Sequence, residues 1–91
     1  MDVLVDRCAG LDVHKDTVMA VVRRPTPDGT GRTQEVRQYR TFTAALRELR
    51  AWLLAERVTQ VAMEATGSYW KPVWYVLVVG EQFRRALHLP R

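Results

Sequence analysis

Residues 8–22, Cys-Ala-Gly-Leu-Asp-Val-His-Lys-Asp-Thr-Val-Met-Ala-Val-Val, decide the fold of this chain. The residues before His14 predict a short strand, and the polar residues His14, Lys15 and Asp16 predict a turn. Residues 17–22 are β-branched or apolar on both faces, which is typical of a strand in the interior of a sheet. The two strands are close enough in the sequence to pair as a hairpin.

The sequence that follows predicts one more strand, a helix and a fourth strand. Residues 33–42 form the third strand, and their many charged side chains suit the edge of a sheet. From residue 43 to residue 57, apolar side chains recur every three or four positions, which indicates an amphipathic helix with Thr41 or Thr43 as its N-cap. Residues 60–63 form the fourth strand. Because a helix links two strands here, a right-handed crossover is expected, with the fourth strand parallel to the first.

Residues 73–79 fit two kinds of structure. Their Val, Trp and Tyr residues favour a strand, whereas Pro72 in a first turn and Ser68 as a cap favour a helix. At helical spacing, Trp70 and Trp74 favour packing in the core over stacking on bases. The expected fold is therefore α/β, with a mixed sheet in the order β-β-β-α-β-(α). Such a sheet is incomplete and should expose an apolar face, which predicts self-association.

Composition excludes three classes of protein. A lone cysteine, Cys8, cannot form an internal disulfide, so the chain is not a disulfide-stabilised secreted domain. The N-terminal residues include acids and lack the apolar core of a signal peptide. The longest apolar run, residues 73–79, is too short to cross a bilayer. A single small cytoplasmic domain without a membrane segment is expected from the 91 residues.

The positive charge is carried mainly by arginine. The chain has 14 Lys and Arg residues against 10 Asp and Glu residues, for a net charge of +4, and 12 of the 14 cations are Arg. The planar guanidinium group suits phosphate because it donates two parallel hydrogen bonds. We predict nucleic-acid contacts at Lys15, Arg23, Arg24, Arg37 and Arg40. The alternative is that they form a solvated sheet edge.

Two acids stand in unusual places, Asp12 inside the first strand and Glu64 at the end of the fourth. A buried carboxylate is costly unless a cation or hydrogen bonds compensate it. If the two strands are neighbours, their backbones lie roughly 5 Å apart, and both acids can bind one divalent cation. Mg²⁺ prefers such hard oxygen ligands. The alternative is that each acid marks a strand end that reaches solvent.

Two motifs carry a resemblance to a known family. Residues 10–15, Gly-Leu-Asp-Val-His-Lys, precede the predicted helix, and residues 61–72, Val-Ala-Met-Glu-Ala-Thr-Gly-Ser-Tyr-Trp-Lys-Pro, follow it. Together they resemble the N-terminal part of the DEDD-type transposases of bacterial insertion sequences, over about residues 8–79. The length of the second motif and its distance from the first make the match specific. The resemblance implies a RuvC-like domain of the ribonuclease H fold.

The resemblance also implies a chemistry. It makes Asp12 and Glu64 the first two acids of a metal-binding quartet that uses Mg²⁺ or Mn²⁺ to cleave and join DNA. Characterised members carry a nucleophilic serine in a later domain and use a structured RNA to select DNA, and the full-length protein is expected to be a homo-oligomer. The remaining two acids of the family are aspartates further downstream, but here no Asp follows Asp28, and only Glu81 follows Glu64. Residues 1–91 are therefore expected to be the N-terminal part of a catalytic domain, inactive alone.

Two other classes of function stay open. One is a non-catalytic, Arg-rich nucleic-acid-binding module in which Asp12 and Glu64 are incidental. The other is a fragment of a sugar-kinase-like or actin-like ATPase, since these also begin with Gly-x-Asp on a first strand. Such ATPases need a Gly-Thr phosphate loop after that strand, and His-Lys-Asp-Thr at 14–17 argues against it. His14 could contact metal or phosphate, but a solvated turn is the favoured interpretation.

Overall fold

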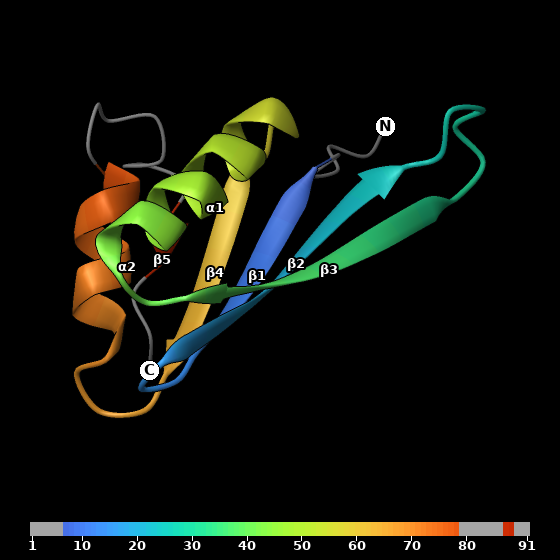
Figure 1. Cartoon of the computed structure of the whole chain (residues 1–91). Coiled ribbons are helices and arrows are strands. Elements are labelled where there is room, and N and C mark those ends of the chain that lie inside the picture. The colour runs from blue at the N-terminus through green and yellow to red at the C-terminus, as the bar shows by residue number, and fades with distance from the viewer. Residues whose placement is uncertain (1–6, 79–86, 89–91) are drawn as a thin grey trace.

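The computed structural model describes residues 7–78 and 87–88. In chain order its elements are β1 (Cys8–Val13), β2 (Thr17–Pro25), β3 (Arg32–Arg40), α1 (Thr43–Ala55), β4 (Gln60–Ala65), α2 (Trp70–Val78) and β5 (Leu87–His88). The strands form one five-stranded sheet in the order β3-β2-β1-β4-β5. β2 is antiparallel to β1 and β3, whereas β4 is parallel to β1 and β5 (Figure 1). The predicted α/β class with a mixed sheet is therefore confirmed.

The hairpin and the parallel pair form as predicted. In the β1–β2 hairpin the backbone N–H of His14 donates to the carbonyl of Thr17 at 2.8 Å, which closes the turn. β3 lies at the edge of the sheet, and each of its residues is exposed or half-buried. α1 connects this edge strand to β4. β4 pairs with β1 on the side of β1 that faces away from β2. The connection joins two parallel strands, as the crossover interpretation requires.

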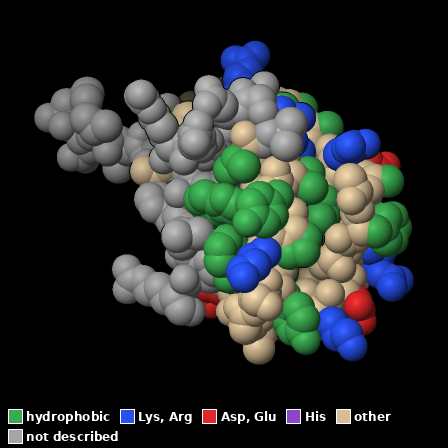
Figure 2. All heavy atoms as spheres, turned by 90° about the vertical axis from the view of Figure 1, so that its left-hand side faces the viewer, with side chains coloured by type: hydrophobic (Ala, Val, Ile, Leu, Met, Phe, Trp, Pro, Cys, Tyr) green, Lys and Arg blue, Asp and Glu red, His purple; other side chains and the backbone are tan. Residues whose placement is uncertain are grey.

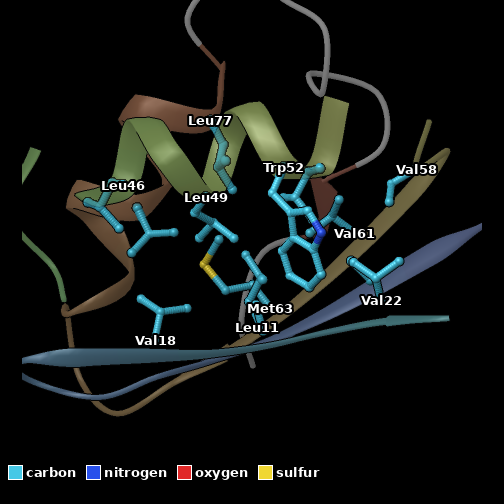
Figure 3. Close-up of a cluster of buried hydrophobic side chains, with 14 of the residues drawn as sticks. Leu11, Val18, Val22, Leu46, Leu49, Trp52, Val58, Val61, Met63 and Leu77 are labelled. Carbon is cyan, nitrogen blue, oxygen red and sulfur yellow. The ribbon is translucent and has the colours of Figure 1, made fainter. Parts of the chain in front are cut away.

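Both helices pack on the same face of the sheet, and the core is the layer between them and the strands. Alternate residues of β1, β2 and β4 point into this layer, as the two-residue period of a strand requires. Figure 3 shows Leu49 of α1 facing Leu11 and Met63 of the sheet. The largest fully buried side chains are Leu46, Leu49, Leu53, Leu77, Val13, Val18, Val22, Val61 and Val73.

The opposite face of the sheet, which we call the open face, is covered by no element within the described residues. Met19 and Val36 lie on it with 38% and 52% of their surface exposed. The open face consists of three rows across β3, β2, β1 and β4: Gln34, Arg23, Cys8 and Gln60; Val36, Val21, Gly10 and Ala62; and Gln38, Met19, Asp12 and Glu64. The predicted exposed apolar face is thus present in the described part of the chain.

Residues 73–78 of the segment that fitted either a strand or a helix are helical, and residue 79 lies outside the described residues. Val73 and Leu77, four positions apart, are fully buried against the core. This burial outweighs the β propensity of the Val and Tyr residues around them, since packing of an apolar face supplies most of a helix's stability. Trp70 and Trp74 pack against the same core in an edge-to-face pair, with ring centroids 6.1 Å apart. The packing interpretation of these two residues is confirmed.

The predicted N-cap of α1 is wrong. The cap residue is Phe42, whose side chain makes no capping hydrogen bond, and Thr43 is already helical. Thr41 does not cap the helix because its hydroxyl instead donates to the carbonyl of Lys15 at 3.2 Å. This hydrogen bond ties the β1–β2 turn to the loop between β3 and α1. The helix also ends two residues before the predicted boundary, at Ala55.

Candidate metal centre

The two acids singled out in the sequence are direct neighbours in the sheet. Asp12 is paired with Glu64 in the parallel register of β1 and β4. Each is the penultimate residue of its strand, so both stand at the carboxyl ends of parallel strands. Because paired residues of adjacent strands point to the same face, both side chains project from the open face. The sheet has therefore brought together two carboxylates that lie far apart in the sequence.

A shallow hollow lies beside the two acids. Its volume is about 400 Å³, and its lining residues come from β1, β2 and β4: Gly10, Leu11, Asp12, Met19, Val21, Ala62 and Glu64. Gly10 and Ala62 are register partners, and because their side chains are absent or small they form the floor of the hollow. A Cβ atom at Gly10 would meet nothing within 4 Å, so the space above the backbone is open. This hollow could not be predicted from the sequence, because it depends on the register of three strands.

Neither carboxylate is buried. Asp12 and Glu64 are both exposed, and no charged residue is buried in the part of the chain that the structure describes. The reason is the missing layer over the open face, which leaves both acids in water without a desolvation cost. The Nε2 atom of His14 lies 3.2 Å from Asp12 Oδ2. A protonated His14 forms an ion pair with this carboxylate.

The donor set fits a hard divalent cation but does not complete its shell. Two carboxylates on adjacent parallel strands supply the oxygen ligands that Mg²⁺ and Mn²⁺ prefer. Within residues 7–78 and 87–88, no group of three or more His, Cys, Asp or Glu side chains could hold a metal ion. Glu81, the only acid after Glu64, lies outside the described residues. Any further ligands must come from water, from nucleic acid or from protein groups outside this set.

Two of the predicted nucleic-acid-binding arginines are held by internal contacts. Arg24 donates to Glu35 and to Glu56, both at 3.1 Å, and so links β2 to β3 and to the end of α1. Arg37 donates to Glu35 at 2.7 Å, and its guanidinium lies 4.3 Å from the centroid of the Trp52 ring. Hydrogen bonds from Arg37 and Arg24 hold the pKa of Glu35 below its usual range. We call these residues the arginine–glutamate cluster, and its visible role is to tie the sheet to α1.

The other three predicted contacts are exposed, and the sheet separates them into two places. Arg40 is paired with Thr17 one step beyond the row of the acids, and Lys15 lies in the adjoining turn. Both therefore lie at the same end of the sheet as Asp12. Arg23 is paired with Cys8, at the other end of the open face. Of the predicted cations, Lys15 and Arg40 are the two placed beside the acids.

Comparison with known proteins identifies the family. The family model of IS110-type DEDD transposases, described as a transposase, matches residues 9–88. Both acids and both sequence motifs lie inside this match. Among curated proteins, none matches the chain. No helix of the described residues is long and apolar enough to span a membrane. Since the match covers most of its 91 residues, the chain belongs to the IS110-type DEDD transposase family.

Proposed function

We propose that residues 1–91 are the N-terminal part of a RuvC-like catalytic domain of the ribonuclease H fold, which cleaves and joins DNA with Mg²⁺ or Mn²⁺. The observation that carries the proposal is the pairing of Asp12 with Glu64 in adjacent parallel strands. The mixed sheet and the helices over one face are compatible with this fold. The proposed DNA substrate follows from membership of a transposase family.

Asp12 and Glu64 are the proposed metal ligands. When bound, a divalent cation at this place activates an attacking oxygen and stabilises a leaving oxygen. His14 positions the Asp12 carboxylate through their 3.2 Å contact. Lys15 and Arg40, at the same end of the sheet, bind the phosphate backbone that enters the hollow.

The proposal gives smaller roles in DNA binding to three other arginines, Arg23, Arg24 and Arg37. Arg23 lies at the far end of the open face and extends the basic surface along a DNA strand. Arg24 and Arg37 reach DNA only if they release Glu35 or share their guanidinium groups with it. We therefore assign their main contribution to stability.

Residues 1–91 alone are proposed to be inactive. Mg²⁺ demands near-ideal octahedral coordination, and two carboxylates leave most of the shell to water. The complete enzyme is proposed to add two downstream aspartates and a serine-bearing domain, to use a structured RNA, and to assemble as a homo-oligomer. Acid-dependent cleavage of DNA by the purified chain would contradict this part of the proposal.

Binding of Mn²⁺ tests the metal site directly. We expect Asp12→Asn and Glu64→Gln each to weaken Mn²⁺ binding at least roughly 10-fold, because each removes one of two ligands and its charge. The matched control is Glu48→Gln, which neutralises an exposed acid on α1 and should bind Mn²⁺ like the wild type. Isothermal titration calorimetry measures the Mn²⁺ dissociation constant of the wild type and of the three variants. Equal, weak binding by all of them would favour the non-catalytic nucleic-acid-binding module instead.

A further inference from the structure

The helical side of the molecule carries a second hollow, which the metal centre does not use. This groove lies between α1 and α2, has a volume of about 350 Å³, and is lined by Thr43, Arg47, Arg50, Tyr75 and Val76. Because both helices cover the sheet face opposite to the open face, the groove and the two acids lie on different sides of the protein. Figure 2 looks onto the side where α2 lies and shows a cluster of hydrophobic side chains with Lys and Arg side chains around it.

The groove follows from the spacing of residues on the two helices. Thr43, Arg47 and Arg50 stand at positions i, i+4 and i+7 and so share one side of α1. On α2, Val73 and Leu77 are buried in the core. Tyr75 lies between them in the sequence, so it projects from the other side of the helix. The packing that buries one side of each helix thus brings the two arginines and the tyrosine together.

The described lining of the groove is cationic. It contains two arginines and no acid, and neither helix has an acid in its first turn. Arg47 is exposed and Arg50 is half-buried, so the charge extends from the rim into the groove. Guanidinium groups bind phosphate oxygens through paired hydrogen bonds. The Thr43 hydroxyl adds a further hydrogen-bonding group beside them.

Tyr75 adds an exposed aromatic ring to the cationic groove, and a site for phosphate alone would not need one. Its side chain is 63% exposed, the highest value among the large apolar and aromatic residues that the structure describes. A planar ring held beside cations is the arrangement on which bases of single-stranded nucleic acids stack. Bases of a duplex are already stacked on each other, so their faces cannot reach such a ring.

We propose that the α1–α2 groove binds a segment of single-stranded DNA, with phosphates on Arg47 and Arg50 and a base stacked on Tyr75. The choice of DNA over RNA rests on the proposed function, whereas the groove itself does not involve the metal centre. Binding here would hold a displaced strand on the helical side while the open face holds the strand at the two acids.

Fluorescence anisotropy with a labelled oligothymidylate, in EDTA, tests the proposal on the full chain. We expect Tyr75→Ala to weaken binding roughly 10-fold, because one stacked base is lost. Tyr75→Phe keeps the ring and should bind like the wild type. Tyr69→Ala is the matched control, since Tyr69 is also exposed but lies outside the groove. Equal binding by wild type and Tyr75→Ala would overturn the proposal.

The phosphate contacts are tested by salt dependence. Removing one contact to a single strand lowers the slope of log K against log salt by about 0.7, so Arg47→Gln with Arg50→Gln should lower it by about 1.4. Arg57→Gln removes the same charge from an exposed position outside the groove and controls for net charge. An equal effect of Arg57→Gln and of each groove substitution would overturn the proposal. So would tighter binding of a duplex or of an oligouridylate.

Two further measurements keep the result interpretable. Tyr75→Ala introduced into the Asp12→Asn chain should weaken oligothymidylate binding by the same factor as it does in the wild-type chain, so failure of the metal centre and failure of the groove are distinguishable. If a groove variant does not fold by circular dichroism, an oligonucleotide with 5-iodouracil is photo-cross-linked to the wild-type chain. We expect the cross-link on Tyr75, and cross-links confined to other residues would overturn the proposal.

Discussion

At the scale of single residues, the exposed acids differ in their hydrogen-bond partners. The carboxylate of Asp28, in the turn between β2 and β3, accepts hydrogen bonds from the hydroxyls of Thr26 and Thr30 at 2.6 and 2.8 Å and from the backbone N–H of Thr30 at 3.0 Å. These bonds orient the turn. Asp12 and Glu64 are also exposed, but they lie on the open face of the sheet, where a ligand can reach them.

The turn acid gives a pH prediction. The hydrogen bond from the Thr26 side chain, followed by those from Thr30, lowers the pKa of Asp28 from 3.8 to about 2. Between these two values the unfolded chain binds more protons than the folded one, so folding stability rises with pH there. The contribution of Asp28 is present above the unfolded pKa and is lost as pH falls through about 2.

Carboxyl ¹³C NMR of the folded chain checks this value. We expect the Asp28 midpoint near pH 2 in the wild type and a rise toward 3.8 in Thr26→Val, which removes the strongest of its hydrogen bonds. A wild-type midpoint at the unperturbed value would contradict the arrangement of the turn.

At the scale of elements, β1 to β4 and α1 could be predicted from the sequence, but β5, α2 and the exposure of the acids could not. The apolar repeat of residues 43–57 depends only on local spacing, so it predicts α1 without knowledge of the elements on which this helix packs. Val73 and Leu77 make α2 a helix by packing on the core, which is a tertiary effect. The exposure of Asp12 depends on whether a layer covers the sheet, which a strand's own sequence does not specify.

A pair of leucines on α1 tests the core. We expect Leu49→Ala, at a fully buried position, to lower the free energy of unfolding by about 2–5 kcal/mol, since the cavity adds to the lost burial. Leu54→Ala makes the same change at a position that is 38% exposed, and its effect should be about 0.5 kcal/mol or less. Urea denaturation measures both. Similar losses at the two positions would mean that α1 presents a different face to the sheet.

At the scale of the whole molecule, the described elements cover the sheet on one face only. The helical layer and the arginine–glutamate cluster close one side, while the row from Val36 to Ala62 leaves an apolar stripe across the other. Exposed apolar surface of this kind favours association. Of the candidate metal centre, only the two acids on neighbouring strands could be predicted, because the hollow beside them arises from the assembled strands.

Self-association through the open face is therefore expected and can be measured by sedimentation equilibrium. Val36→Lys places a charge at the β3 end of the stripe and should shift the chain toward monomer by roughly 10-fold or more in dissociation constant, the effect of burying an unpaired charge. Leu54→Lys introduces the same charge at an exposed site on the helical side and should leave the association unchanged. Equal dissociation by both variants would point to a general effect of net charge.

The parallel pairing of β1 with β4 also sets the order of events during synthesis. The β1–β2–β3 meander can form from contacts between neighbouring strands as soon as these have left the ribosome, whereas β4 arrives only after α1 has been made. Pairings between distant parts of a chain form late, because closing a long loop costs entropy before the contact is made. Asp12 is therefore synthesised before Glu64 by the whole length of β2, β3 and α1. A nascent chain that stops in this interval contains Asp12 but neither Glu64 nor the strand that carries it.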